Sequence, residues 1–238
     1  MFASATAWWA PKAGNAAQEY EDAYAVEEAA LRFAVADGAS ETSFARQWAE
    51  LLVDRFVHEP PTPESLRDWI APMQATWAGA NKPKATAWYA EEKARDGAFS
   101  SLLGVAFNQG RWRALAIGDS CLFIVRAGKL AHAFPLEKAA QFNNRPMLLS
   151  SVARANQGVW DQVRQGEGDL IEKDQLLLMT DALAQWFLVE AEMGRRPWAA
   201  LAKAAATQES FTAFVDMLRS GGALRNDDTT LVRVEVAA

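Results

Sequence analysis

The sequence predicts an α+β protein, a four-layer αββα sandwich in which two antiparallel sheets are flanked by helices. Two observations predict this class. Short apolar runs typical of strands and amphipathic stretches typical of helices form separate, alternating blocks along the chain, as in antiparallel sheets with helices on their outer faces. The chain also has 238 residues, of which 50% are hydrophobic. That is enough for a substantial core, and we expect a single domain over residues 1–238.

The first block contains strands and then a helix. Strands are expected where short runs rich in apolar residues are bounded by polar residues or glycine. These runs are Ala5–Trp9, Ala23–Val26 and Leu31–Ala36. From Thr42 to His58 apolar residues recur at helical spacing on one face, and Thr42 is a candidate N-cap. The first helix is therefore predicted over this stretch.

Two further helices are expected before the next strands. Thr62 and Pro63 are typical of the cap and first residue of a helix, which would run to about Ala78 with a break near Pro72. A shorter helix is expected at about Lys84–Arg95. Both helices follow the first block of strands and would cover one face of a sheet.

A second block of strands is predicted to form a meander, in which successive antiparallel strands are joined by tight turns. The expected strands are Phe99–Asn108, Trp112–Ile117, Leu122–Arg126 and Leu130–Phe134. The expected turns are Gln109-Gly110, Gly118-Asp119 and Ala127-Gly128. After a loop near Asn143 no clear strand is predicted until Leu176.

The last part of the chain contains one strand, a helical block and a final strand. A strand over Gln175–Thr180 is expected because its residues are mostly apolar. The expected helices are Ala182–Met193, Pro197–Thr207 and Phe211–Leu218, and the final strand is Thr229–Val236.

Five short acidic motifs follow one another along the chain, most of them where a strand-like run ends. They are Glu21-Asp22, Asp37-Gly38, Gly118-Asp119-Ser120, Thr180-Asp181 and Asp227-Asp228-x-Thr230. Folding can bring such strand ends to one rim of a sheet, where crowded carboxylates raise each other's pKa unless cations neutralise them. Oxygen donors without histidine or cysteine suit magnesium or manganese. The pattern predicts a site for a pair of divalent cations.

Each motif taken alone also has a structural interpretation. Asp-Gly is frequent at strand ends because both residues favour turns. Gly118-Asp119-Ser120 lies between two apolar runs and fits an ordinary hairpin connection. The functional interpretation therefore depends on the order and spacing of all the motifs together.

In order and spacing these motifs resemble those of the type 2C metal-dependent protein phosphatases, in the bacterial style. The resemblance extends from about Gly14 to Val236 and includes the continuation Arg126-Ala127-Gly128-Lys129-Leu130 after the Gly-Asp-Ser motif. It implies a protein serine/threonine phosphatase that hydrolyses phosphoserine and phosphothreonine. The family uses a water that bridges two Mn²⁺ or Mg²⁺ ions, without a covalent enzyme intermediate.

The resemblance also implies the ligands of the two main metals. Asp37 would bridge both ions and is a catalytic candidate, and Gly38 would contribute its backbone carbonyl. Asp181 and Asp227 would each hold one ion. Asp228 stands where asparagine is more usual, and it would be the ligand in place of Asp227 if the register slips by one residue.

Other acids have weaker roles in the family. Asp22, with Glu21 as a second candidate, would act through metal-bound waters. Asp119 would help to hold an additional, weaker ion and is the second catalytic candidate. The resemblance does not indicate which residues bind the rest of the substrate.

Three positions depart from the family's pattern. Ala17 stands where an arginine usually holds the substrate phosphate, and Lys12 is a nearby basic residue. Ala39 follows Asp-Gly, where a histidine often serves as the general acid, and loss of a general acid costs about 10²-fold to 10⁴-fold in rate. Ala182 replaces the usual glycine after Thr-Asp. These departures leave open a catalytically weak or inactive phosphatase-like module with a regulatory or binding role.

Composition limits the partners and the location. A net charge of −6 and a pI near 5.1 argue against a nucleic-acid partner. The N-terminus lacks the features of a signal peptide, no apolar run is long enough to span a bilayer, and the single Cys121 cannot form an internal disulfide. We therefore expect a cytoplasmic protein that acts on a phosphorylated protein away from membranes. The oligomeric state is not predicted.

Overall fold

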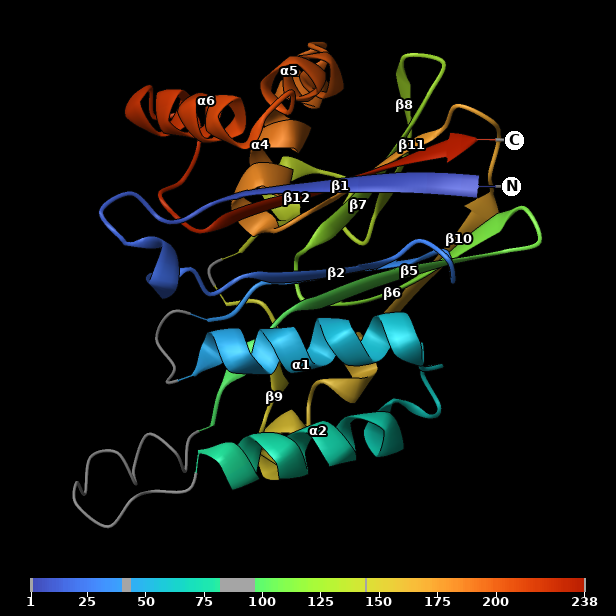
Figure 1. Ribbon diagram of the computed structural model, residues 1–238, viewed down its shortest axis with the longest axis vertical. Coiled ribbons are helices and arrows are strands. Elements are labelled where there is room, and N and C mark those ends of the chain that lie inside the picture. The colour runs from blue at the N-terminus through green and yellow to red at the C-terminus, as the bar shows by residue number, and fades with distance from the viewer. Residues whose placement is uncertain (1, 40–43, 82–96, 144, 238) are drawn as a thin grey trace.

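The computed structural model describes residues 2–39, 44–81, 97–143 and 145–237. Among these residues, two antiparallel sheets of five strands each lie face to face. Figure 1 shows α1 and α2 beneath one sheet and α4, α5 and α6 above the other. The predicted α+β class and the αββα order of layers are confirmed.

The upper sheet in Figure 1 has the order β1-β12-β11-β7-β8. Its strands are β1 (Phe2–Ala10), β12 (Thr229–Ala237), β11 (Gln175–Met179), β7 (Cys121–Arg126) and β8 (Lys129–Phe134). The lower sheet has the order β10-β6-β5-β3-β2. Its strands are β10 (Arg164–Asp169), β6 (Arg111–Ile117), β5 (Leu102–Asn108), β3 (Arg32–Ala36) and β2 (Ala23–Glu27). A separate small ladder pairs β4 (Phe99–Ser100) with β9 (Leu149–Ser150).

The helices cover the outer faces of the two sheets. Beneath the lower sheet lies α1 (Ala45–His58), and α2 (Leu66–Ala80) packs against α1. Above the upper sheet lie α4 (Asp181–Glu192), α5 (Pro197–Ala204) and α6 (Gln208–Ser220). Among the described residues, no helix is both long enough and apolar enough to cross a membrane.

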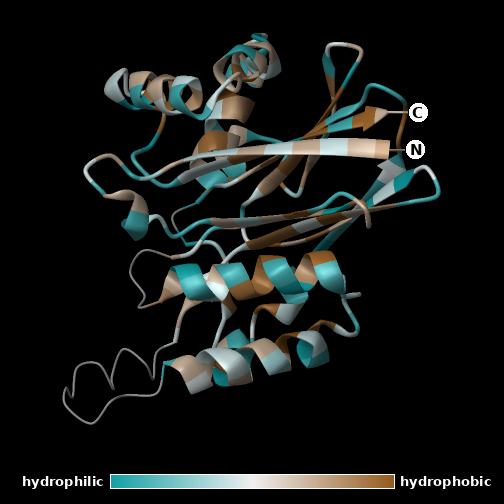
Figure 2. Cartoon of the chain, viewed as in Figure 1, coloured by the Kyte–Doolittle hydropathy of each residue, from teal (hydrophilic) through white to brown (hydrophobic). Residues whose placement is uncertain are grey.

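The core has three apolar layers because the central strands are buried on both faces. In β3, Phe33 and Val35 point to the layer between the sheets, while Ala34 and Ala36 point to α1. Small residues on the outer face let α1 approach closely, and a Cβ atom added at Gly104 would lie 2.1 Å from the ring of Phe56. Figure 2 shows hydrophobic residues along the central strands and a mixture of hydrophilic and hydrophobic residues on the helices.

The predicted meander is wrong at Gly118-Asp119. β6 and β7 lie in different sheets, so this segment crosses from one sheet to the other and does not close a hairpin. Gly118 has a φ of +91°, and a Cβ atom there would lie 2.7 Å from the Cβ of Ser101. The sequence could not distinguish a hairpin from a crossing, because the flanking strands are apolar on both faces in either case.

Several element boundaries also differ from the predictions. The expected strand Phe99–Asn108 is interrupted at Ser101, whose backbone N–H donates to the Asp37 carbonyl at 2.9 Å, so that β4 pairs with β9 instead. The second helix begins at Leu66, and Thr62 accepts a 3.3 Å hydrogen bond from the Ser65 N–H in the preceding turn. Pro72 lies inside α2 without ending it.

Two predictions concern residues that the structure does not describe, and two strands were missed. Thr42 and the helix expected at Lys84–Arg95 lie outside the described residues. The missed strands are the two-residue β9 and the longer β10. β10 is an edge strand of polar residues and glycine that has no apolar periodicity. Its two glycines lie against Trp112, where a Cβ atom at Gly168 would be 2.8 Å from the indole nitrogen.

Candidate metal centre

All the acidic motifs meet at one end of the sandwich, on the left in Figure 1. Antiparallel pairing explains this. The end of β3 lies beside the start of β2, and the end of β11 lies beside the start of both β12 and β7. Residues that follow β3 and β11, or precede β2, β7 and β12, are therefore brought together. The structure thus gathers residues that are up to about 200 positions apart in the sequence.

Three carboxylates form the centre of this rim. Oxygen atoms of Asp37, Asp119 and Asp181 all lie within 4.8 Å of one another. Burial raises the pKa of Asp37 well above its usual value, and the charges of Asp181, Asp22, Asp119 and Asp227 raise it further. Burial, with a contribution from Asp181, also raises the pKa of Asp119 to about 7. Such a cluster is stabilised by added positive charge.

Two buried oxygen atoms are left without partners in the cluster. Oδ1 of Asp22 and Oδ1 of Asp119 have no hydrogen-bond partner among the described residues. An unpartnered buried carboxylate oxygen is costly, and such groups in folded proteins call for an ion or water. Because the donors are all carboxylate or carbonyl oxygens, the residues present fit Mg²⁺ or Mn²⁺.

Asp22 is held in place by two threonines whose role the sequence did not reveal. Its Oδ2 accepts a 2.6 Å hydrogen bond from the Thr230 hydroxyl, and Tyr20 bonds the same hydroxyl at 2.5 Å. The Thr180 hydroxyl accepts from the Thr230 N–H at 2.9 Å. The threonines of the Thr180-Asp181 and Asp-Asp-x-Thr230 motifs therefore orient Asp22, a residue far away in the sequence.

Asp227 and Asp228 have different surroundings. The two carboxylate oxygens of Asp228 accept backbone hydrogen bonds, from the Lys12 N–H at 2.7 Å and the Glu21 N–H at 2.6 Å. Asp228 thus fastens the segment before β2 to the start of β12. The Asp227 carboxylate instead faces the cluster and lies 3.3 Å from the guanidinium of Arg225. Both oxygens of Asp228 are thus occupied by backbone N–H groups, whereas Asp227 shares the guanidinium of Arg225 with Asp181.

Backbone contacts fix the Asp37-Gly38 turn. The Asp37 carbonyl accepts from the Ser101 N–H at 2.9 Å and from the Ser100 hydroxyl at 2.8 Å, while the Asp37 N–H donates to the Ser101 hydroxyl at 3.0 Å. Ser101 is in turn bonded to Ser120 at 2.7 Å, next to Asp119. A Cβ atom at Gly38 would lie 2.6 Å from the Glu21 carbonyl oxygen, so a larger residue does not fit.

Arg225 is a further residue of the site that the motifs did not indicate. It lies in the loop between α6 and β12, and its guanidinium forms ion pairs with Asp181 and Asp227. The only available signal was its position two residues before Asp227, which does not reveal the direction of the side chain.

Two of the three alanines that depart from the family's pattern lie beside the rim. Ala17 is exposed in the short 3₁₀ helix Ala17–Glu19, and Ala39 directly follows the Asp37-Gly38 turn. A groove of about 470 Å³ borders this region. Its lining includes Lys12, Glu19, Tyr20, Glu21, Phe44 and Arg46.

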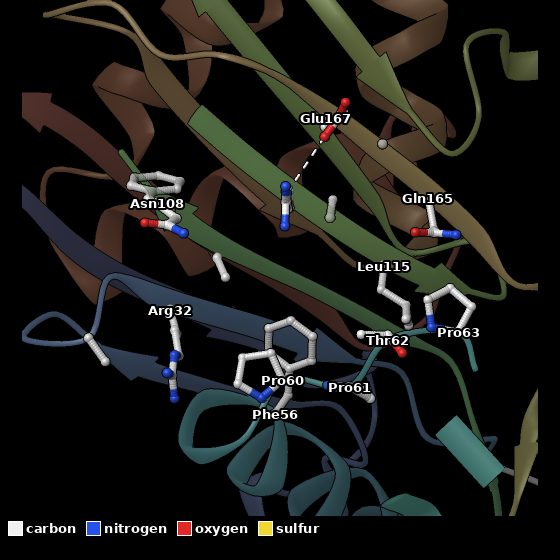
Figure 3. A pocket seen from close by; sticks show the side chains of 16 residues that line it. Arg32, Phe56, Pro60, Pro61, Thr62, Pro63, Asn108, Leu115, Gln165 and Glu167 are labelled. Atoms are coloured by element: carbon white, nitrogen blue, oxygen red, sulfur yellow. Dashed lines mark ion pairs between the residues drawn. The ribbon is translucent and has the colours of Figure 1, made fainter. Parts of the chain in front are cut away.

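A larger cavity of about 940 Å³ lies elsewhere, at the opposite end of the lower sheet. Figure 3 shows Pro60, Pro61 and Pro63 facing strand residues such as Leu115 and Gln165 across it. The charged side chains of this cavity already have partners within the protein. Arg32 donates to the Val57 and His58 carbonyls, at 3.1 and 2.5 Å, and Arg113 lies 3.6 Å from Glu167. None of the cluster acids lines this cavity.

The fold and this rim together define an αββα sandwich with an oxygen-ligand cluster where the ends of its two sheets meet. A sequence profile for protein phosphatase 2C matches residues 14–226, so the chain belongs to the protein phosphatase 2C family. A search of curated protein sequences found no significant match.

Similar solved structures support the same fold. The catalytic domain of the serine/threonine phosphatase PstP in complex with two manganese ions is 16% identical with a TM-score of 0.64, and the match covers 100% of this chain and 99% of that one. The serine/threonine phosphatase PstP/Ppp of Mycobacterium tuberculosis is also 16% identical with a TM-score of 0.64, and the match covers 100% of both chains. Stp1 of Staphylococcus aureus is 13% identical with a TM-score of 0.66, and the match covers 100% of this chain and 96% of that one. RsbX in complex with magnesium is 15% identical with a TM-score of 0.55, and the match covers 99% of this chain and 96% of that one. At these identities the comparisons establish the shared fold.

Proposed function

We propose that this protein is a metal-dependent serine/threonine phosphatase that hydrolyses phosphoserine and phosphothreonine in protein substrates. The observation that carries the proposal is the cluster of Asp37, Asp119 and Asp181, whose carboxylate oxygens lie within 4.8 Å of one another. Each of the three acids belongs to one of the motifs that carry the family resemblance, which supports a metal-binding role for the cluster. The manganese and magnesium ions in the PstP and RsbX structures support the same choice of cofactor.

In this proposal the chain holds two Mn²⁺ or Mg²⁺ ions through Asp37, the Gly38 carbonyl, Asp181 and Asp227. Asp22 acts through water, and Asp119 helps to hold a third, weaker ion. When bound, such ions lower the pKa of an attacking water and neutralise the charge that develops on the phosphoryl group. The protein's own contribution is to hold the carboxylates at fixed positions through the backbone contacts of Asp37 and the threonine contacts of Asp22.

A second candidate function is a phosphatase-like regulatory or binding module. Ala17 and Ala39 lack the functional side chains of the family's pattern, and Arg225 is paired with two of the proposed ligands. Such a module would bind metal or a phosphorylated partner without turnover. The first experiment below separates the two candidates.

Hydrolysis of an aryl phosphate is expected to require Mn²⁺ or Mg²⁺ and to be abolished by excess chelator, because water is too weakly acidic to attack without the ions. Zn²⁺ should substitute poorly, since the site offers no nitrogen or sulfur ligand. The measurement is the initial rate across a metal titration. Full activity in excess chelator would contradict the metal-dependent mechanism, whereas metal-induced stabilisation without any turnover would favour the module.

Aryl phosphates are expected to be cleaved about 10²-fold to 10⁴-fold faster than phosphoserine peptides, because Ala39 offers no proton to a serine alkoxide while a phenolate leaves without one. The variant Ala39→His should raise the rate on phosphoserine peptides and change the aryl rate little, with Ala39→Asn as the matched control. Equal wild-type rates on both substrates would show that another group supplies the proton.

A further inference from the structure

Arg225 occupies the place where a cation would bind. Its guanidinium is ion-paired with Asp181 and lies 3.3 Å from Asp227, the two acids proposed to hold one metal each. The charge of Arg225 also acts on Asp119 and Asp37, so it reaches the whole cluster. In the metal-free protein this guanidinium therefore offsets part of the carboxylate charge.

The guanidinium and the divalent ions would compete for the same two carboxylates, because Arg225 contacts Oδ2 of both Asp181 and Asp227. A divalent ion repels the guanidinium and binds carboxylate oxygens more strongly, so metal loading displaces the Arg225 side chain. That side chain is 40% exposed and has a solvent-facing side into which it can turn.

The loop that carries Arg225 is anchored on both sides. Before Arg225, the Leu224 N–H donates to the Leu218 carbonyl at 3.2 Å, and two further contacts hold the residues after it. The buried side chain of Arg219 donates to the Asp227 carbonyl at 2.6 Å and to the Pro11 carbonyl at 2.9 Å. Asn226 accepts from the Ala13 N–H at 2.8 Å. Displacement therefore moves the side chain and not the loop, and the freed guanidinium stays at the rim.

A guanidinium at the edge of a two-metal site has the geometry and charge to bind phosphate. Its planar fork of N–H donors matches two phosphate oxygens at once. Ala17 supplies no such group. Two other basic residues line the neighbouring groove. Arg46 is paired with Glu50 at 2.9 Å, and the ammonium group of Lys12 lacks the planar pair of N–H donors that arginine offers to a phosphate.

We propose that Arg225 binds the substrate's phosphate in the metal-loaded protein and is released for this role when metal ions take its carboxylate partners. The proposal rests on the phosphatase function proposed above. It makes metal binding and phosphate binding depend on each other, because one side chain takes part in both equilibria.

The test uses the full chain and two binding measurements that need no turnover. Calorimetry would give the affinity for Mn²⁺ and, in saturating Mn²⁺, the affinity for inorganic phosphate. Arg225→Gln is expected to bind Mn²⁺ about tenfold more tightly, since no side chain competes. It should bind phosphate about 10-fold to 100-fold more weakly, as for a lost charge-assisted hydrogen bond. Arg46→Gln and Lys12→Gln are the matched controls and should change neither affinity more than about twofold.

The outcomes separate this proposal from the proposed function. Unchanged phosphate affinity in Arg225→Gln, or weaker Mn²⁺ binding in that variant, would overturn the role of Arg225. An equal loss of phosphate binding in either control would move the phosphate site to the groove. If Arg225→Gln does not fold, the test uses Arg225→Lys. Lysine keeps the positive charge but lacks the paired N–H donors of the guanidinium, so this variant should bind phosphate several-fold more weakly. Normal metal and phosphate binding without turnover by wild type would instead refute the phosphatase function alone.

Discussion

Asp37→Asn is expected to abolish turnover while leaving the metal-free protein at least as stable as wild type. Asp37 is surrounded by Asp22, Asp119, Asp181 and Asp227, which together with burial raise its pKa. At an effective dielectric constant near 20, each like charge at about 6 Å contributes at most about 3 kcal/mol of repulsion. Asparagine removes that repulsion and keeps the shape, and the contacts to Ser100 and Ser101 use only the Asp37 backbone.

Thermal melts with and without Mn²⁺, together with an aryl phosphate assay, measure this effect. Stabilisation by a bound ion follows its affinity, so Mn²⁺ should raise the melting temperature of the variant less than that of wild type. Asp54→Asn is the matched control, because the Asp54 side chain is 76% exposed on α1. A variant that melts well below wild type without metal and keeps its Mn²⁺ response would make Asp37 a structural turn residue, and our site assignment would be wrong.

Arg126→Met is expected to lower the free energy of unfolding by about 3 kcal/mol, since removing one partner of a buried ion pair costs about 3–5 kcal/mol and Arg126 itself is partly exposed. Asp174 is fully buried and accepts hydrogen bonds from Nε and Nη2 of Arg126, at 2.8 and 2.7 Å, and from the Ile171 N–H at 2.9 Å. Methionine keeps the apolar stem and leaves the carboxylate without its cation.

Chemical denaturation of the metal-free protein would measure the loss. Arg111→Met is the matched control, because Arg111 pairs with Asp169 and Glu167 at the surface, where such pairs contribute about 0–1 kcal/mol. Arg126→Met combined with Asp174→Asn should recover part of the stability. The Mn²⁺ response should remain, because Arg126 is at the end of β7 away from Asp119. A loss no larger than that of the control would show that Asp174 does not depend on Arg126.

The strands that position the site were predictable because both of their faces are buried. β3 and β11 are continuous apolar runs, which distinguishes them from the solvent-facing β10. An acid that follows such a run lies at the rim, so local sequence was sufficient to predict that Asp37 and Asp181 lie there. The polar residues and glycines of β10 have little strand preference of their own. They form a strand because β10 pairs with the edge of β6 and its glycines pack against Trp112.

The contacts that complete the site could not be predicted, because they join distant parts of the chain. Thr230 reaches Asp22 across 208 positions, and Ser101 reaches Asp37 across 64. The crossing at Gly118 depends on which sheet receives β7, which no residue near Gly118 encodes. Arg225 could have pointed to solvent or to the cluster, and the charge of acids supplied by other strands determines its direction.

The pairing of β1 with β12 also determines where appended sequence would emerge. Phe2 is opposite Ala237, and Ala10 is opposite Thr229, beside the rim. Strands of this length extend about 25–30 Å, so both ends of the described chain leave from one corner, on the side of the molecule away from the carboxylates (Figure 1). A tag, linker or neighbouring domain attached to either end would therefore leave the approach to the rim open, and two such attachments would be held next to each other.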